Sequence, residues 1–135
     1  MKKVIISVLI SGIVLLLLSA VMFYMSVYFF PSVTQEYLSP VFRASGGIDW
    51  LYYAHPFVLS IALKWFWERY KGIFHGSYIV RAIEVALVYG IVAMVPVLWL
   101  TFGAIDISIQ MVISWLVYGL IQAFVAGIIF AKLNP

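Results

Sequence analysis

Three long runs without a charged residue constrain the fold of this chain more than any other feature. They cover residues 4–30, 85–105 and 107–131. A helix needs about 20 apolar residues to cross the hydrocarbon core of a bilayer, and each run is long enough. Apolar residues make up 66% of the chain and charged residues 10%, which is too few charges to cover a water-soluble domain. The sequence therefore predicts an all-α polytopic membrane protein.

The first run favours a retained membrane helix over a cleaved signal peptide. It stays uncharged from residue 4 to residue 30, whereas the apolar region of a signal peptide spans about 7–15 residues. Pro31 ends the run, and the aromatic residues just before it are typical of a membrane interface. Over 31–49 we expect an ordered outer loop or a short interfacial helix, and Ser32 and Gln35 have the spacing of a helix capping box.

A fourth, shorter segment covers residues 50–67. Its uncharged part, 50–63, is short enough for an interfacial or re-entrant segment. Aromatic residues mark both ends, Trp50 at one and Trp65 and Trp67 at the other, and Lys64 lies close enough to the end to extend toward the headgroups. We therefore expect a second transmembrane helix over 50–67 and an inner loop over 68–80.

The distribution of basic residues supports four spans with both termini in the cytoplasm. Cytoplasmic loops are enriched in Lys and Arg. With four spans, the inner side holds Lys2, Lys3, Lys64, Arg69, Lys71, Arg81 and Lys132. The outer side holds Arg43. Without the second span, basic residues of the inner loop would move to the outer side, namely Lys64, Arg69, Lys71 and Arg81. The sequence therefore predicts a single four-helix domain over 1–135.

The last two segments are predicted to form an antiparallel hairpin of helices over 81–103 and 107–131. Pro96 lies inside the first of them and leaves the carbonyl of Val92 without its helical donor, so we expect a kink there. Residues 87–91 and 116–120 share the pattern Leu-Val-Tyr-Gly followed by an aliphatic residue. This similarity is either the remnant of an inverted repeat or a chance match between apolar sequences.

Two ridges with a spacing of four residues follow the last segment. The polar ridge consists of Gln110, Ser114, Tyr118 and Gln122. The small ridge consists of Gly119, Ala123 and Gly127, and the preceding segment offers Ala82, Ala86 and Gly90. Small residues allow helices to approach closely and polar residues hydrogen-bond across them, so we favour a helix-packing seam. The alternative is a polar path through the membrane.

Charged residues near the inner face are spaced for ion pairs on one helix face. Lys64 and Glu68 are four residues apart, and Arg81 and Glu84 are three apart. We favour an anchoring role over gating or proton transfer, because these residues lie near helix ends. On the outer side we expect Glu36, Asp49, His55 and Asp106. Their spacing does not support a metal site, and we predict none.

Motifs of enzymes are missing from the sequence, and the chain has no cysteine. We therefore expect neither an enzyme nor a bound cofactor, and no binding of nucleic acid. Size and span number are similar to those of small multidrug transporters and small fluoride channels, but the first segment lacks a membrane-embedded glutamate and the fluoride-channel signature is missing. The favoured interpretation is a structural or accessory protein of the bacterial plasma membrane that packs with itself or a larger membrane partner. The alternative is a small oligomeric transporter or channel.

Overall fold

The computed structural model describes residues 2–42 and 49–135, and these residues form helices and no strand. The elements are α1 (Lys2–Phe29), α2 (Pro31–Glu36), α3 (Asp49–Tyr70), α4 (Tyr78–Tyr89), the π-helix η1 (Gly90–Met94), α5 (Val95–Ala104) and α6 (Ile109–Leu133). The predicted outer position of Arg43 lies outside the described residues, and so does the side chain of Asp49.

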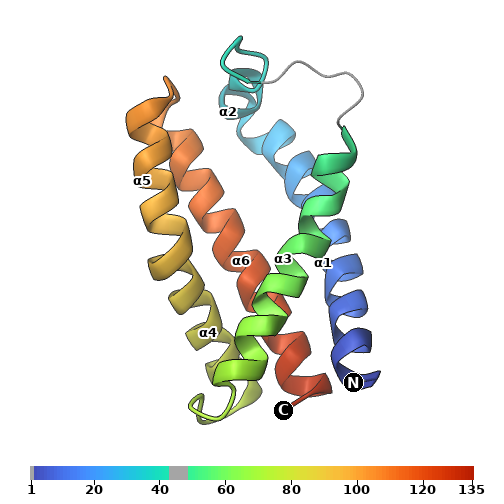
Figure 1. Cartoon of the computed structure of the whole chain (residues 1–135). Coiled ribbons are helices and arrows are strands. Elements are labelled where there is room, and N and C mark those ends of the chain that lie inside the picture. Colours follow the sequence, from blue (N-terminus) through green and yellow to red (C-terminus); the bar gives the residue numbers. More distant parts are fainter. Residues whose placement is uncertain (1, 43–48) are drawn as a thin grey trace.

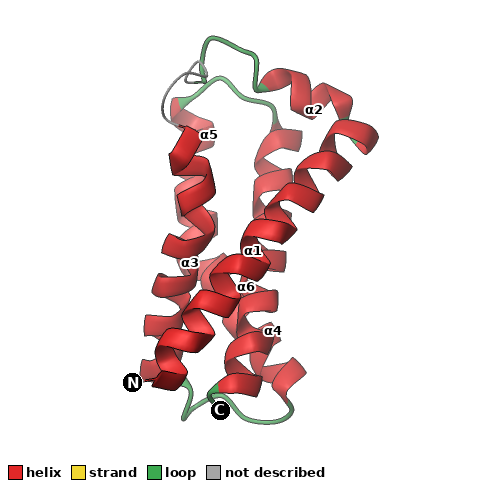
Figure 2. Ribbon diagram, turned by 90° about the vertical axis from the view of Figure 1, so that its right-hand side faces the viewer, coloured by secondary structure: helices red, strands yellow, loops and turns green. Residues whose placement is uncertain are grey.

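The helices run alternately up and down along one bundle axis. The elements α4, η1 and α5 follow one another without a break and form one column, and α1, α3 and α6 form the others (Figure 1). Both ends of the chain lie at the same end of the bundle, which we call the terminal end, and α2 lies at the opposite end (Figure 1). Figure 2 shows α1 running obliquely from the terminal end toward α2. The α4 and α6 helices pack closely along their length, and α1 packs against α3 and α6.

Within the described residues, three helices are long and apolar enough to cross a membrane: Lys2–Phe29, Tyr78–Ala104 and Ile109–Leu133. This finding agrees with the predicted class of helical membrane protein. With 22 residues, α3 is roughly 33 Å long at 1.5 Å per residue, but its composition is less apolar. Its crossing of the membrane stays a prediction.

Local residues explain why the helix bounds differ from those expected. Ser77 accepts a hydrogen bond from the Val80 amide and starts α4 at Tyr78, three residues early. Ser108 does the same for Met111, so α6 starts at Ile109 and not at residue 107. The predicted capping box at Ser32 is wrong, because α2 begins at Pro31 without a side-chain cap.

The effect of Pro96 is a π-turn in the column. The Val95 amide donates to the carbonyl of Gly90, five residues back, and Pro96 then lies in the first turn of α5. Proline has no amide hydrogen to continue the α-helical pattern, and a wider turn before it is one way in which a helix absorbs that loss. The expected local distortion is therefore centred on Gly90–Met94.

Two apolar clusters hold the bundle together. The larger lies between α1, α3, α4 and α6 and includes the buried side chains of Leu15, Trp67, Val85 and Phe130. The smaller lies near α2, where Val33, Ile107 and Met111 are buried beside Phe42 and Trp115. The second cluster fixes the segment after α1 on the start of α6.

Candidate functional site

A hydrogen-bond network joins α1 and α6 in the middle of the bundle. The Gln122 amide nitrogen donates to the hydroxyl of Tyr118 at 2.9 Å and to that of Ser19 at 3.4 Å. The Tyr118 hydroxyl donates to Ser19, which donates to the carbonyl of Leu15 at 2.8 Å. Gln122 is 1% exposed and lies roughly 20 Å along an α6 of roughly 37 Å. In hydrocarbon such donors need protein partners, and this network supplies them.

The remainder of the predicted polar ridge does not join this network. Ser114 donates to the carbonyl of Met111 in its own helix at 2.7 Å, and Gln110 is exposed. Each step of four residues turns the ridge by roughly 40° around the helix, so its two ends face different neighbours. The structure therefore brings together Tyr118 and Gln122 and separates them from Gln110.

Sequence reasoning missed the contribution of α1 to this network. Ser7, Ser11 and Ser19 are all buried on the face that packs against the other helices. They share a spacing of multiples of four residues, which is the same kind of pattern that marked the polar ridge. Serine carries no charge, so these hydroxyl groups do not interrupt the uncharged run over residues 4–30.

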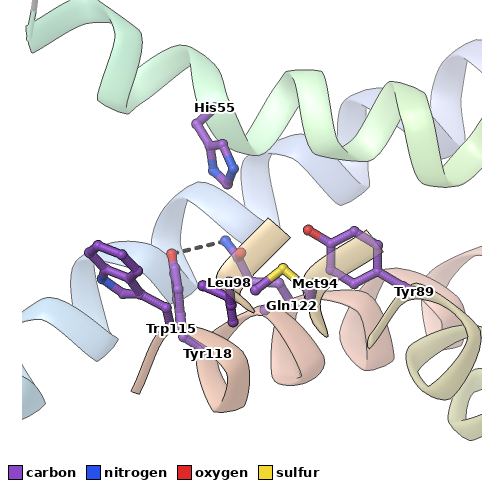
Figure 3. A pocket seen from close by; sticks show the side chains of 8 residues that line it. His55, Tyr89, Met94, Leu98, Trp115, Tyr118 and Gln122 are labelled. Carbon is purple, nitrogen blue, oxygen red and sulfur yellow. Dashed lines mark hydrogen bonds between the residues drawn. The ribbon is translucent and has the colours of Figure 1, made fainter. Parts of the chain in front are cut away.

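A cavity of about 270 Å³ lies next to the network, between α3 on one side and the η1 column and α6 on the other (Figure 3). It is partly open to the outside of the bundle. Its lining consists of His55, Tyr89, Met94, Leu98, Trp115, Tyr118, Gly119 and Gln122. Apolar and aromatic walls with a few polar groups are typical of small-molecule sites, and this cavity is slightly smaller than most.

His55 lies in the first half of α3 and lines this cavity. The structure directs its imidazole ring across the cavity toward Tyr118 and Gln122 (Figure 3). The residue precedes Pro56, which is buried within α3. Tyr89, the last residue of α4, faces the same cavity. Neither side chain hydrogen-bonds to another residue in the described part of the chain, so the cavity holds two polar groups without protein partners.

The similar segments of residues 87–91 and 116–120 meet at this cavity. Tyr89 and Tyr118, the tyrosines of the two Tyr-Gly pairs, both line it. A side-chain carbon at Gly90 would lie 2.6 Å from a terminal carbon of Leu120, and one at Gly119 would lie 2.7 Å from the end of Met94. An added methyl group at either glycine would therefore require the end of a neighbouring side chain to move.

The predicted seam residues lie between α4 and α6. Ala82 and Ala123 are fully buried, and Ala86 is 7% exposed. At Gly127 an added Cβ would lie 2.9 Å from the Cα of Ala82. That contact is to backbone, which cannot move aside as a flexible side chain can. Here the two helices are as close as small residues allow.

A buried lysine organises the charges at the terminal end. The Lys64 ammonium lies 2.8 Å from a carboxylate oxygen of Glu68 and 5.0 Å from the centre of the Phe130 ring, and Lys64 is 1% exposed. Lys71 lies 3.5 Å from the other oxygen of Glu68. The predicted pair of Lys64 and Glu68 is thus close in space, and the carboxylate compensates a charge that would otherwise be costly to bury.

The structure does not pair Arg81 with Glu84 among the residues it describes. The Arg81 guanidinium instead lies 4.6 Å from the centre of the Trp67 ring and donates to the carbonyl of Lys71 at 3.4 Å. The aromatic face provides a favourable electrostatic contact for the cation. One buried oxygen of Glu84 has no hydrogen-bond partner. The spacing of Arg81 and Glu84 in the sequence did not predict that the guanidinium would instead contact an aromatic ring.

The final residues are fixed to α3. The Trp67 indole donates to the carbonyl of Asn134 at 2.9 Å, and Lys71 donates to the Asn134 side chain at 3.4 Å. The Asn134 amide donates to Glu68. These bonds close the terminal end of the bundle around α3 and α6.

Glu36 caps α6 at the opposite end. Its carboxylate accepts hydrogen bonds from the amide of Ser108 at 2.5 Å and from its hydroxyl at 2.6 Å. The indole of Trp115 donates to the hydroxyl of Tyr37, and burial raises the pKa of Tyr37 above its ordinary value. Glu36 therefore acts at a helix N-terminus, where a negative charge is favourable. Asp106 is exposed, and no cluster of three metal-ligating side chains occurs among the described residues.

No protein-family model, no curated protein and no solved structure matches this chain. The interpretation of the cavity and the network therefore depends on their own chemistry.

Proposed function

We propose that this chain is a four-span membrane protein of structural or accessory type, which acts by helix packing with a larger membrane partner. In this proposal α3 also crosses the membrane, which gives four spans in total, and both termini face the cytoplasm of a bacterial cell. The alternating direction of the helices and the shared position of the chain ends support this arrangement (Figure 1). Lys64, Arg81 and Lys132 lie toward the terminal end, as expected for a cytoplasmic side.

The closed network of Ser19, Tyr118 and Gln122 carries the structural part of the proposal. Its donors bind one another and the backbone of α1, so they hold helices together. A conduit would need polar groups that follow one another along the membrane normal and stay available to a solute. Gln110 and Ser114 do not continue the network, so this geometry favours packing over a path along α6.

One observation favours the alternative of a small transporter. A proton-coupled carrier needs a titratable group deep in the membrane. His55 faces the same cavity as Gln122, which lies near the middle of α6. This alternative predicts that His55→Gln abolishes solute uptake in proteoliposomes while His75→Gln, on the exposed inner loop, retains it. Equal uptake by both variants would remove this support.

Single cysteines test the topology, because the chain has none of its own. Ser39 lies before α3, and Gly72 lies after it with open space around it. If α3 crosses, a membrane-impermeant maleimide labels Ser39→Cys in intact cells and labels Gly72→Cys only after permeabilisation. Labelling of both variants in intact cells, or of neither, would rule out that α3 crosses the membrane.

Purification in mild detergent tests the partner. The affinity tag belongs at the N-terminus, because Asn134 bonds to α3 and a C-terminal tag would disturb it. We expect native mass spectrometry to show one membrane partner at a fixed stoichiometry, and we expect the tagged partner to bring down this chain in return. A clean monomer or homo-oligomer from cells at native expression would refute the accessory role.

A further inference from the structure

We propose that the cavity between α3, η1 and α6 binds a neutral molecule of one or two aromatic rings that carries a carbonyl oxygen. This binding site goes beyond the structural role proposed above. It rests on the volume of the cavity, the character of its walls and the two polar groups that face it (Figure 3).

The volume sets the size of the ligand. An engineered apolar cavity of about 150 Å³ holds a benzene molecule. The present cavity measures about 270 Å³, which leaves room for a fused pair of rings or for one ring with substituents. A long acyl chain would extend beyond it through the open side.

The walls favour a flat, uncharged ligand. Trp115 and Tyr118 contribute aromatic rings, and Met94 and Leu98 contribute apolar side chains. Aromatic rings pack well against such surfaces, and the thioether of methionine adapts to them. The paired cations described above, Lys64 among them, lie toward the terminal end. A charged ligand would therefore lose its hydration without gaining a counterion.

The unpaired polar groups in the cavity favour a ligand that carries a hydrogen-bond acceptor. Tyr118 and Gln122 direct the donors described above into the network with Ser19. The hydroxyl of Tyr89 and the ring of His55 have no partner among the described residues. A neutral imidazole donates through one nitrogen, and a phenol donates through its hydroxyl. A carbonyl oxygen on the ligand would accept a hydrogen bond from one or both donors, for which lipid hydrocarbon offers no acceptor.

The test uses the intact chain in lipid nanodiscs with two probes of matched shape. The first probe is 2-methyl-1,4-naphthoquinone, and the second is 1,4-dimethylnaphthalene, which lacks carbonyl groups. The chain has no cysteine, so the quinone cannot react with a thiol. Saturable quenching of tryptophan fluorescence reports binding, after subtraction of quenching in nanodiscs with Trp115→Phe. We expect the quinone to bind at least tenfold more tightly than the hydrocarbon.

Matched variants assign the preference to the two donors. Tyr89→Phe removes one hydroxyl and should weaken quinone binding roughly three- to tenfold, in keeping with one hydrogen bond. Tyr53→Phe, at an exposed tyrosine of α3, should leave it unchanged. His55→Phe should weaken binding to a similar extent, and His75→Phe in the exposed inner loop should not. Neither donor variant should change the affinity for the hydrocarbon.

Three results would overturn the proposal. The first is quenching that does not saturate, which indicates partition into lipid alone. The second is equal affinity for both probes, which indicates an apolar groove for acyl chains. The third is an equal effect of Tyr89→Phe and Tyr53→Phe. Size-exclusion profiles and circular dichroism show whether each variant folds, and if His55→Phe does not fold, Tyr89→Phe decides the outcome.

Discussion

Replacement of Gly127 by alanine tests the contact of this glycine with the backbone of α4. The added Cβ would lie 2.9 Å from the Cα of Ala82, 3.2 Å from its Cβ and 3.3 Å from its carbonyl oxygen. Favourable contacts between carbon atoms begin at about 3.5 Å. The α4 and α6 helices would therefore have to separate by roughly 0.6 Å or more, or shift along each other.

The expected cost follows from that separation. Overpacking of a well-packed core typically costs about 1–3 kcal/mol. Alanine also has a helix propensity about 1 kcal/mol better than glycine, which offsets part of the cost. The net loss should be smallest where a neighbour can move. At Gly119 the obstructing atom is the end of the Met94 side chain, so we expect Gly127→Ala to be more destabilising than Gly119→Ala.

Gly103 supplies the matched control. It lies in α5, and among the described residues no atom beyond its chain neighbours and its own helix backbone comes within 4 Å of the position of an added Cβ. Gly103→Ala should be neutral or slightly stabilising, because it gains helix propensity without a clash. The unfolding midpoint of each variant is measured in dodecyl maltoside micelles by titration with sodium dodecyl sulfate, followed by tryptophan fluorescence.

The order of the three variants decides whether the reasoning holds. We expect stability to fall from Gly103→Ala through Gly119→Ala to Gly127→Ala. If Gly127→Ala were as stable as Gly103→Ala, the backbone contact with Ala82 would not limit the packing of α4 on α6. The seam would then not be the feature that brings these helices together.

Substitutions test three further contacts, each by the same unfolding titration. Gln122→Leu removes the centre of the network and should cost about 0.6–1.7 kcal/mol, the range of interhelical hydrogen bonds in membranes; no change would show that the network adds no stability. Glu36→Gln removes the charge at the start of α6 beside Ser108 and should cost about 0.3–1 kcal/mol, with a smaller loss in high salt. Glu68→Ala removes the carboxylate that compensates the buried Lys64 ammonium. It should therefore destabilise the fold more than Lys64→Met, which removes the buried charge itself. The reverse order of stability would refute this account of the pair.

The run lengths in the sequence were sufficient to predict the helical membrane class. A stretch of about 20 residues without charge has few alternatives to a membrane helix, whatever its neighbours. The capping residues Ser77 and Ser108 then moved the helix starts by two or three residues. Such changes depend on a single hydrogen bond, which a count of apolar residues does not register.

The candidate site was harder to predict, because it depends on how helices rotate and tilt against one another. The sequence grouped Gln110 with Gln122 on one ridge, but packing placed only Gln122 against α1. It also grouped His55 with the outer carboxylates, whereas the structure directs its ring into the cavity toward Tyr118 and Gln122 (Figure 3). Tilt and rotation follow from contacts with neighbouring helices and not from segment length.

The π-turn over Gly90–Met94 sets which face of α5 meets α6. A turn closed by a bond five residues back holds one residue more than an α-helical turn. Loss of a single codon within this turn would restore the regular winding and leave the facing of α5 unchanged, because the wider turn absorbs the extra residue. Regular α-helical winding of the full sequence would instead rotate α5 by roughly 100°. The position of Leu98, which is 7% exposed, would then be taken by Val97, which is 62% exposed. The π-turn therefore keeps the buried and the exposed surfaces of α5 in place despite its additional residue.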